Sequence, residues 1–163
     1  MSELPGGWTP EAVLGGQADR VVMRARRPGE APVVVKATPP GAGWRSRAAL
    51  RREARLLEAA QGEGVVHLLD VLDRQGRTVL VLAFVPAGAL ADRTAPDRDL
   101  VVAHLTTTVE RLHRLGLAHG ALRPEHILLE ADGRPVLCGF GAAHRNHDRD
   151  PDATALAALI RTV

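Results

Sequence analysis

The chain has 163 residues, 45% of them hydrophobic and 25% charged, and its 21 basic and 19 acidic residues leave a net charge of +2. This length predicts about one domain, and the composition is typical of a soluble globular protein, which excludes a wholly disordered or collagen-like chain. The small net charge provides no electrostatic case for binding nucleic acid. With two Phe, two Trp and no Tyr, the chain also lacks the aromatic residues that stack on single-stranded bases.

The sequence predicts a protein of the cytoplasm. No apolar run approaches the roughly 18 residues that span a bilayer. The first five residues carry neither a basic segment nor an apolar one, so no secretion signal is expected. Cys138 is the single cysteine and cannot form an internal disulfide, which fits a reducing compartment. Twenty Arg against a single Lys, Lys36, is typical of a GC-rich genome such as an actinobacterial one.

The first half of the chain is predicted to form strands, then a helix, then two more strands. Runs rich in β-branched residues are separated by turns at Gly15-Gly16-Gln17 and at 28–30. An Arg-, Ala- and Leu-rich segment then predicts a helix, and a turn at Gln75-Gly76 joins the later strands. The predicted strands are 12–14, 20–25, 33–36, 65–72 and 78–85, and the predicted helix is 46–60.

The second half is predicted to be mainly helical. A long helix covers about 97–115 and ends at Gly116, and a shorter apolar helix covers 153–160. Between them, strands at 127–129 and 135–137 are predicted to form a hairpin across the two-residue turn Asp132-Gly133.

One face of the helix at 46–60 carries an acidic residue among apolar ones. Four residues at i, i+3, i+4 and i+7 share this face: Leu50, Glu53, Ala54 and Leu57. A buried carboxylate needs a partner. Lys36, on a preceding strand, is one candidate, and a neighbouring arginine such as Arg52 is the other. The arginines on the remaining faces are interpreted as solvated surface: Arg45, Arg47, Arg51, Arg52 and Arg55.

The order of elements resembles the protein kinase fold. Residues 119–129 read His-Gly-Ala-Leu-Arg-Pro-Glu-His-Ile-Leu-Leu, which is similar to the catalytic loop His-Arg-Asp-Leu-Lys-Pro-Glu-Asn-Ile-Leu-Leu. Residues 137–141 resemble the strand that leads into Asp-Phe-Gly, and residues 84–90 resemble the hinge and linker. The resemblance covers roughly residues 10–160.

The resemblance implies an α+β protein kinase-like fold in one domain. A five-stranded N-lobe sheet with its αC helix is expected at 8–85, a hinge at 86–90, and a reduced, mainly helical C-lobe at 91–163. Ten residues between Gly141 and Asp152 are too few for a long activation segment, so the C-lobe is expected to be truncated.

The positions that match the catalytic residues of the family have lost their chemistry. Phosphoryl transfer needs a carboxylate to orient the attacking hydroxyl and oxygen ligands to hold Mg²⁺. The matching positions are Ala121, His126 and Gly139, and Arg123 replaces the family's Lys. His119-Gly120 echoes the His-Gly-Asp of aminoglycoside-type phosphotransferases, but those enzymes need the same Asp. No catalytic residue and no metal site is therefore expected.

Nucleotide binding is less clearly excluded. In the family's Gly-rich loop only Gly15 keeps its glycine, since Gln17 and Arg20 replace the other two and Asp19 adds negative charge. Lys36 with Glu53 is interpreted first as a structural pair without cofactor, and second as part of a site for ATP without Mg²⁺. The residues that match a nucleotide site are Gly15, Val22, Val34, Lys36, Glu53, Ala83, Val85 and Leu128.

The resemblance implies that the internal scaffold of the family is retained. The matching positions of the apolar column that kinases stack between their lobes are Leu57, Leu68, His119 and Phe140. Asp152 resembles the acid that begins the helix anchoring the catalytic loop.

The loop before Asp152 has a second interpretation as a metal site, although such loops are usually solvated. The ligands would be His144, His147, Asp148, Asp150 and Asp152.

The last helix is expected to form an interface. Leu156, Leu159 and Ile160 make an apolar stripe of which the helix at 97–115 can cover one side, and the rest predicts a protein partner or a homodimer. The alternative is that this helix packs under the catalytic loop and completes a reduced lobe. The sequence as a whole therefore predicts a catalytically inactive pseudokinase that acts as a binding, regulatory or scaffolding module, without nucleic acid or membrane as a partner. The alternative is an atypical ATP-binding phosphotransferase with unorthodox catalytic residues.

Overall fold

The computed structural model describes residues 4–92, 97–145 and 150–162. The chain divides into two compact units: the first holds residues 1–55 and 67–84, and the second holds 56–66 and 85–163. The chain leaves the first unit after Arg55, returns to it at His67 and leaves it again after Phe84. The assignment of residues 56–66 to the second unit is a feature that the sequence did not predict.

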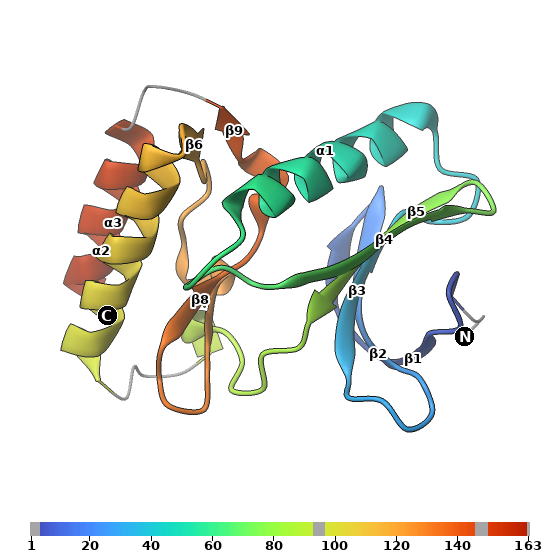
Figure 1. Ribbon diagram of the computed structural model, residues 1–163, viewed down its shortest axis with the longest axis horizontal. Coiled ribbons are helices and arrows are strands. Elements are labelled where there is room, and N and C mark those ends of the chain that lie inside the picture. The colour runs from blue at the N-terminus through green and yellow to red at the C-terminus, as the bar shows by residue number, and fades with distance from the viewer. Residues whose placement is uncertain (1–3, 93–96, 146–149, 163) are drawn as a thin grey trace. The chain divides into compact units, whose positions relative to one another are not determined.

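The first unit is a five-stranded antiparallel sheet with a helix (Figure 1). The strands lie in the order β1-β2-β3-β5-β4, and α1 follows β3 in the sequence. This arrangement confirms the mixed α+β fold with its five-stranded sheet. The elements are β1 (Thr9–Gln17), β2 (Arg20–Arg26), β3 (Val33–Ala37), α1 (Trp44–Ala60), β4 (Leu68–Arg74) and β5 (Arg77–Ala83).

Two predicted boundaries in the first unit are wrong. Gly15 and Gly16 do not form the first turn but lie inside β1, and the hairpin turns at Ala18-Asp19. A Cβ atom at Gly16 would lie 2.7 Å from the Arg20 carbonyl oxygen, whereas one at Gly15 would meet nothing within 4 Å. Close packing in the hairpin therefore requires a glycine at position 16 but not at position 15. The fourth strand begins at Leu68, not at residue 65.

The two faces of the sheet are covered by different segments. Alternation along β3 sends Val35 and Ala37 to one face and Lys36 to the other. Helix α1 covers the Lys36 face through a cluster of Leu50, Ala54 and Leu80, with Leu68 packed against it. The opposite face is covered by the N-terminal segment, in a cluster of Leu4, Trp8, Met23, Ala25, Val33, Val35, Ala37, Val79 and Val81.

The N-terminal segment is an ordered part of the core, although Pro5-Gly6-Gly7 reads as a loop. Leu4 N–H donates to the Trp8 carbonyl at 3.0 Å. The Arg27 guanidinium stacks 4.0 Å from the centre of the Trp8 ring and donates from Nε to the Gly6 carbonyl at 2.8 Å. The segment thus covers the face of the sheet opposite Lys36, where apolar burial and one cation–π contact hold it.

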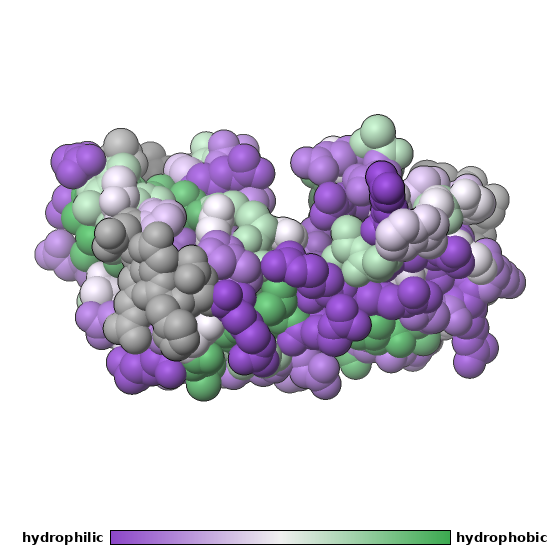
Figure 2. Space-filling view, turned by 90° about the horizontal axis from the view of Figure 1, so that it is seen from above, coloured by the Kyte–Doolittle hydropathy of each residue, from purple (hydrophilic) through white to green (hydrophobic). Residues whose placement is uncertain are grey.

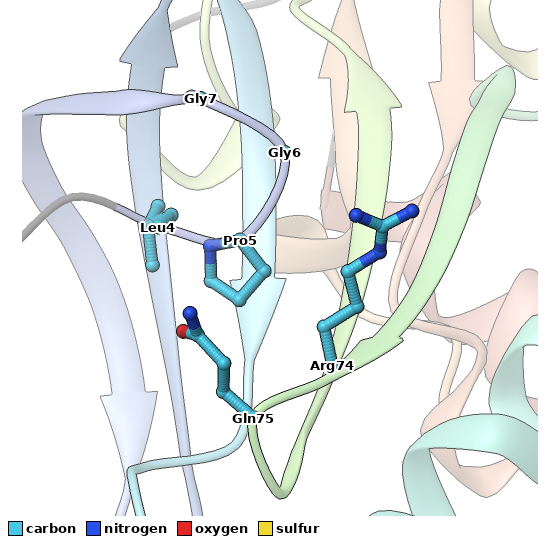
Figure 3. Close-up of a pocket in the computed structure, with 6 residues that line it drawn as sticks. All are labelled: Leu4, Pro5, Gly6, Gly7, Arg74 and Gln75. Atoms are coloured by element: carbon cyan, nitrogen blue, oxygen red, sulfur yellow. The ribbon is translucent and has the colours of Figure 1, made fainter.

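A hollow of about 320 Å³ lies where this segment faces the β4–β5 turn (Figure 3). It is lined by Leu4, Pro5, Gly6, Gly7, Arg74 and Gln75. Gln75 and Gly76 both have positive φ, 53° and 68°, as a two-residue hairpin turn requires, so the turn predicted at Gln75-Gly76 is confirmed.

The second unit contains two helices that pack against each other (Figure 1). The long helix begins after Asp97, whose carboxylate accepts from Leu100 N–H at 3.0 Å, an N-cap that satisfies a free backbone donor. The elements are η1 (Leu90–Asp92), α2 (Arg98–Arg114), β6 (Leu117–Ala118), η2 (Pro124–His126), β7 (Ile127–Leu129), β8 (Pro135–Leu137), η3 (Phe140–Ala142), β9 (His144–Arg145) and α3 (Asp150–Thr162).

The hairpin of β7 and β8 is present, but its connection is longer than predicted. The strands pair from Ile127 to Leu129. Residues 130–134 then connect them, with Glu130 N–H donating to the Arg134 carbonyl at 2.9 Å and Gly133 N–H to the Glu130 carbonyl at 3.0 Å. The two-residue turn at Asp132-Gly133 is therefore replaced by a five-residue loop.

The last helix buries one residue of the predicted interface stripe within its own chain. Helix α3 packs on α2, and Arg98 donates to the Ile160 carbonyl at 2.6 Å. Leu159 is only 5% exposed, while Leu156 and Ile160 are half-buried. Leu159 is therefore a core residue and cannot belong to a partner-binding face.

The outer surface of α1 is basic. Figure 2 shows hydrophilic residues along the stretch that α1 occupies in Figure 1. Arg45, Arg52 and Arg55 are exposed, and Arg51 forms a two-pronged ion pair with Asp73 at 2.6 and 2.9 Å. Within residues 4–92, 97–145 and 150–162, no helix combines the length and the apolar character that crossing a bilayer requires.

The two tryptophans provide a matched test of the N-terminal segment. Trp8 is 5% exposed and Trp44 is 69% exposed. We expect Trp8→Ala to lower the free energy of unfolding by about 3 kcal/mol, because it leaves a cavity in the core. Trp44→Ala should change it by less than about 0.5 kcal/mol. Guanidinium titration followed by circular dichroism measures both, and equal effects would show that residues 4–8 do not stabilise the sheet.

Candidate functional site

The first unit holds a buried ion pair between β3 and α1. Lys36 Nζ donates to both carboxylate oxygens of Glu53, at 2.6 and 2.7 Å. Glu53 is only 3% exposed. The predicted pairing is confirmed, and Arg52 is exposed. Because both oxygens face the same ammonium, the carboxylate is satisfied in a place where an unpaired charge would cost several kcal/mol.

A third charged group, Arg20, reaches the same carboxylate. Its guanidinium lies 3.7 Å from Glu53 Oε2 and its Nε donates to Asp19 at 3.1 Å. Val22 lies directly opposite Lys36 in the β2–β3 pairing, so Arg20, two residues earlier on β2, is on the Lys36 face of the sheet. This contact was not predicted, because Arg20 reads in the sequence only as a replacement for a glycine of the family. Residues two apart on a strand share a face, so the position of Arg20 relative to Val22 could have indicated it.

The remaining residues that match a nucleotide site are divided between the units. Gly15, Val22, Val34 and Ala83 belong to the first unit, and Val85 and Leu128 to the second. Val34 lies opposite Leu82, and Ala83 N–H already donates to the His67 carbonyl at 2.9 Å. The structure thus brings together Val22, Lys36 and Glu53 through the sheet and α1.

The second unit holds the loop that resembles a catalytic loop, and His119 lies at its centre. The imidazole is buried. Its Nε2 lies 2.8 Å from the Cys138 carbonyl, and its Nδ1 accepts from Ala121 N–H at 3.3 Å. Nε2 therefore carries the proton and the ring is neutral. The ring meets Phe140 edge-on, with centroids 4.8 Å apart.

Of the four positions of the expected apolar column, His119 and Phe140 are thus in direct contact. Leu57 is buried and belongs to the same unit. Leu68 belongs to the first unit, where it packs against Leu50, Ala54 and Leu80.

Asp152 anchors this loop from the first turn of α3. Its carboxylate accepts from His119 N–H at 2.7 Å and from Gly120 N–H at 2.9 Å, and His113 Nε2 lies 3.2 Å away on α2. Asp152 is only 1% exposed. The role expected from the resemblance, an acid that begins a helix and holds the loop backbone, matches these contacts. Charge-assisted hydrogen bonds of this kind are among the strongest in proteins.

His126 is tied to the degenerate positions of the same loop. Arg123 lies 3.2 Å from His126 Nε2, and His126 Nδ1 lies 2.8 Å from the Ala121 carbonyl. Because a guanidinium only donates, Nε2 accepts and Nδ1 carries the proton. The imidazole is therefore held in one orientation from both of its nitrogens.

The His126 ring also fills the space beside Gly139. A Cβ atom at Gly139 would lie 2.6 to 2.8 Å from three atoms of this ring, and Gly139 has φ of 78°, which disfavours any side chain. The loss of the Asp at this position and the replacement of Asn by His126 are therefore structurally coupled. An acidic side chain at 139 cannot be accommodated while His126 keeps its position.

The described part of the loop therefore offers little for metal chemistry. Ala121 and Gly139 have no side-chain oxygen, and Mg²⁺ prefers oxygen ligands to imidazole. In the described ranges no three His, Cys, Asp or Glu side chains converge. Two residues of the alternative metal site have other contacts. His144 Nδ1 lies 3.1 Å from the Ala142 carbonyl, and the Asp152 carboxylate accepts from the backbone of His119 and Gly120. His147 and Asp148 lie outside the described residues.

Burial lowers the pKa of the His119 imidazole below its usual range. The hydrogen bond to the Cys138 carbonyl and the charge of Asp152 oppose this shift, and His126 adds to it. The lowered pKa agrees with the neutral ring assigned from the hydrogen bonds.

Stability should consequently fall with acidity in a way that depends on His119. The folded state takes up this proton less readily than the unfolded state, whose pKa is about 6.5. Stability is thus fully present above that pH and decreases below it, by at most about 1.4 kcal/mol per pH unit. We expect His119→Gln, which can still donate to Cys138, to flatten the dependence between about pH 7 and 5 in thermal melts. The exposed His67→Gln is the control, and equal slopes in wild type and His119→Gln would refute this assignment.

The coupling between Gly139 and His126 can be measured by a double-mutant cycle. We expect Gly139→Asp to lower the free energy of unfolding by about 2 kcal/mol or more, through backbone strain and the clash with the ring. Adding His126→Ala should recover at least about 1 kcal/mol, since the clash disappears.

Gly88→Asp is the matched control for that cycle. Gly88 also has positive φ, 83°, but a Cβ atom there would meet nothing within 4 Å, so His126→Ala should not rescue it. Strictly additive effects of Gly139→Asp and His126→Ala would contradict the coupling.

Comparison with known proteins identifies similar chains. A family model described as a protein kinase domain matches residues 10–158. The putative ribosomal protein S6 kinase alpha-1 of Caenorhabditis elegans is 31% identical over 123 residues, 71% of this chain and 16% of that protein. The hormonally up-regulated neu tumor-associated kinase of Homo sapiens is 29% identical over 102 residues, 58% of this chain and 14% of that protein. The chain thus spans only about one sixth of the length of these relatives, or less.

Proposed function

Because the chain belongs to the protein kinase domain family, we propose that it is a pseudokinase, a kinase-like module that binds other molecules without transferring phosphate. It would act in the cytoplasm as a regulatory or scaffolding component. The observation that carries this proposal is the packing of His126 against Gly139, together with Ala121. At the three positions where the family places oxygen ligands and its catalytic acid, this chain has two side chains without oxygen and one imidazole.

The loss is difficult to compensate by local adjustment. A water molecule bound at Ala121 would have no carboxylate to take the proton of an attacking hydroxyl. A metal-bound phosphate would need ligands that the loop does not supply. The His126 imidazole is hydrogen-bonded to the Ala121 carbonyl and to Arg123. These contacts give the imidazole a structural role in the loop.

The second candidate is an atypical ATP-binding phosphotransferase. The Lys36–Glu53 ion pair favours it, since this pair matches the family's phosphate-binding Lys and its helix partner. A buried ion pair is nevertheless weak evidence for catalysis, because it also fits a purely structural role. We therefore place the pseudokinase first.

We further propose that the partner is a protein or a second copy of this chain, and that no metal cofactor is needed. The burial of Leu159 removes the centre of the interface first expected on α3, so only the half-buried Leu156 and Ile160 remain as candidates there. Light scattering of the purified chain distinguishes a second copy from a different protein, and a monomer excludes the former.

We expect no kinase activity from the wild-type chain. With radiolabelled ATP and either Mg²⁺ or Mn²⁺, transfer to protein or small-molecule acceptors should equal that of Lys36→Met, because neither can activate the acceptor hydroxyl. Arg26→Ala, an exposed change on β2, serves as the matched control. Transfer that persists in Arg26→Ala and disappears in Lys36→Met would support the phosphotransferase instead.

A further inference from the structure

Arg20 places a guanidinium where the family's Gly-rich loop has a glycine. The side chain is 24% exposed and points to the α1 side of the sheet, where it lies 3.7 Å from Glu53. It belongs to the first residue of β2, directly after the hairpin turn. The contact therefore connects the tip of the β1–β2 hairpin to helix α1 within one compact unit.

The charges around Arg20 cancel one another. Glu53 receives two hydrogen bonds from Lys36 and the ion pair from Arg20, while Arg20 Nε donates to Asp19. Two cations thus face two anions, and both carboxylate oxygens on Glu53 are engaged. A cluster neutralised in this way offers no surplus positive charge to an incoming phosphate, and Asp19 would repel it.

Bulk acts in the same direction as charge. The family's glycines allow the hairpin backbone to approach a phosphate closely, but Gln17 and Arg20 carry side chains. Gly16 is required by the hairpin itself, because a Cβ there would lie 2.7 Å from the Arg20 carbonyl oxygen.

We propose that Arg20 is an ionic lock, a residue that holds the β1–β2 hairpin against α1 and excludes the phosphate groups of nucleotides from Lys36. This inference rests on the proposed function, because it explains how the Lys36–Glu53 pair can persist as a structural pair. It assigns Arg20 as the residue that determines specificity against nucleoside triphosphates.

The test measures ATP binding by calorimetry in the presence of EDTA, so that metal plays no part. We expect negligible binding by wild type and a gain in affinity of about fivefold or more for Arg20→Ala combined with Asp19→Asn, since this pair of changes removes the guanidinium beside Lys36 and keeps the net charge of the cluster at zero. The gain should vanish when Lys36→Met is added to this double variant. Arg26→Ala is the matched control, because Arg26 lies on the same strand and pairs with Glu11 at 2.9 Å, away from Glu53.

Hydrogen exchange supplies a second measurement. Amides of residues 15–22 should exchange faster in Arg20→Ala than in Arg26→Ala, because the lock that holds the hairpin is lost. Arg20→Gln keeps the aliphatic stem and replaces Arg20→Ala if the latter does not fold. In wild type, the lock predicts that ATP leaves exchange at 15–22 unchanged, so protection by ATP overturns the proposal whatever the variants do.

The other outcomes are equally decisive. Wild-type binding that weakens in the variant with both Arg20→Ala and Asp19→Asn would make Arg20 a phosphate ligand, and equal affinity in both proteins would leave the residue no role in nucleotide exclusion. ATP binding by wild type without phosphate transfer would refute the lock alone. Phosphate transfer would refute the pseudokinase, so the failures of the two proposals can be distinguished.

Discussion

A carboxylate that is removed from water must receive other hydrogen-bond donors, and each unit of this protein is arranged around one such group. Glu53 is 3% exposed and Asp152 is 1% exposed. Glu53 takes Lys36 from β3 and Arg20 from the β1–β2 hairpin, while Asp152 takes the backbone of the loop at His119 and Gly120. Since an unpaired buried charge would cost several kcal/mol, these contacts determine which segments must lie together.

The two carboxylates support the framework of a protein kinase domain in a chain that has Ala121, His126 and Gly139 at the positions matching the family's catalytic groups. Asp152 still holds the loop backbone, and His119 still packs on Phe140. These contacts stabilise the fold whether or not phosphate is transferred. At Gly139, which matches the family's Asp, the adjacent space is filled by the His126 ring. The residues that hold this loop and the positions that match the family's catalytic groups are therefore different residues of the same loop.

Local packing also explains why such changes are difficult to reverse one at a time. Restoring an acidic residue at 139 would place a side chain on a backbone of positive φ and against an imidazole that is fixed from both of its nitrogens. The same holds in the first unit, where Arg20 has become part of the charge balance around Glu53. Gly139 and Arg20, which differ from the family's residues, are thus each constrained by a neighbouring side chain, His126 and Glu53 respectively.

Several features could be predicted from the sequence because they depend on local periodicity. The helical spacing of Leu50, Glu53 and Ala54 placed a carboxylate on an apolar face, and a single Lys on the preceding strand supplied its partner, as observed. Other expectations failed where the structure of a segment depends on its pairing or packing with another segment. Gly15 and Gly16 read as a turn but lie inside β1, because the pairing with β2 continues to Gln17. Leu159 read as exposed, but α2 covers α3.

The sequence by itself determined the order of elements, the kinase-like loop and the absence of oxygen ligands at Ala121 and Gly139, because side-chain chemistry and short-range periodicity are written residue by residue. Only the tertiary structure decided that Trp8 completes the core, that Arg20 shares Glu53 with Lys36, and that His126 occupies the space beside Gly139. Those facts depend on which face of a strand or loop meets another segment. Contacts of this kind depend on how the whole unit packs, because the space beside a residue is filled by side chains that are distant from it in the sequence.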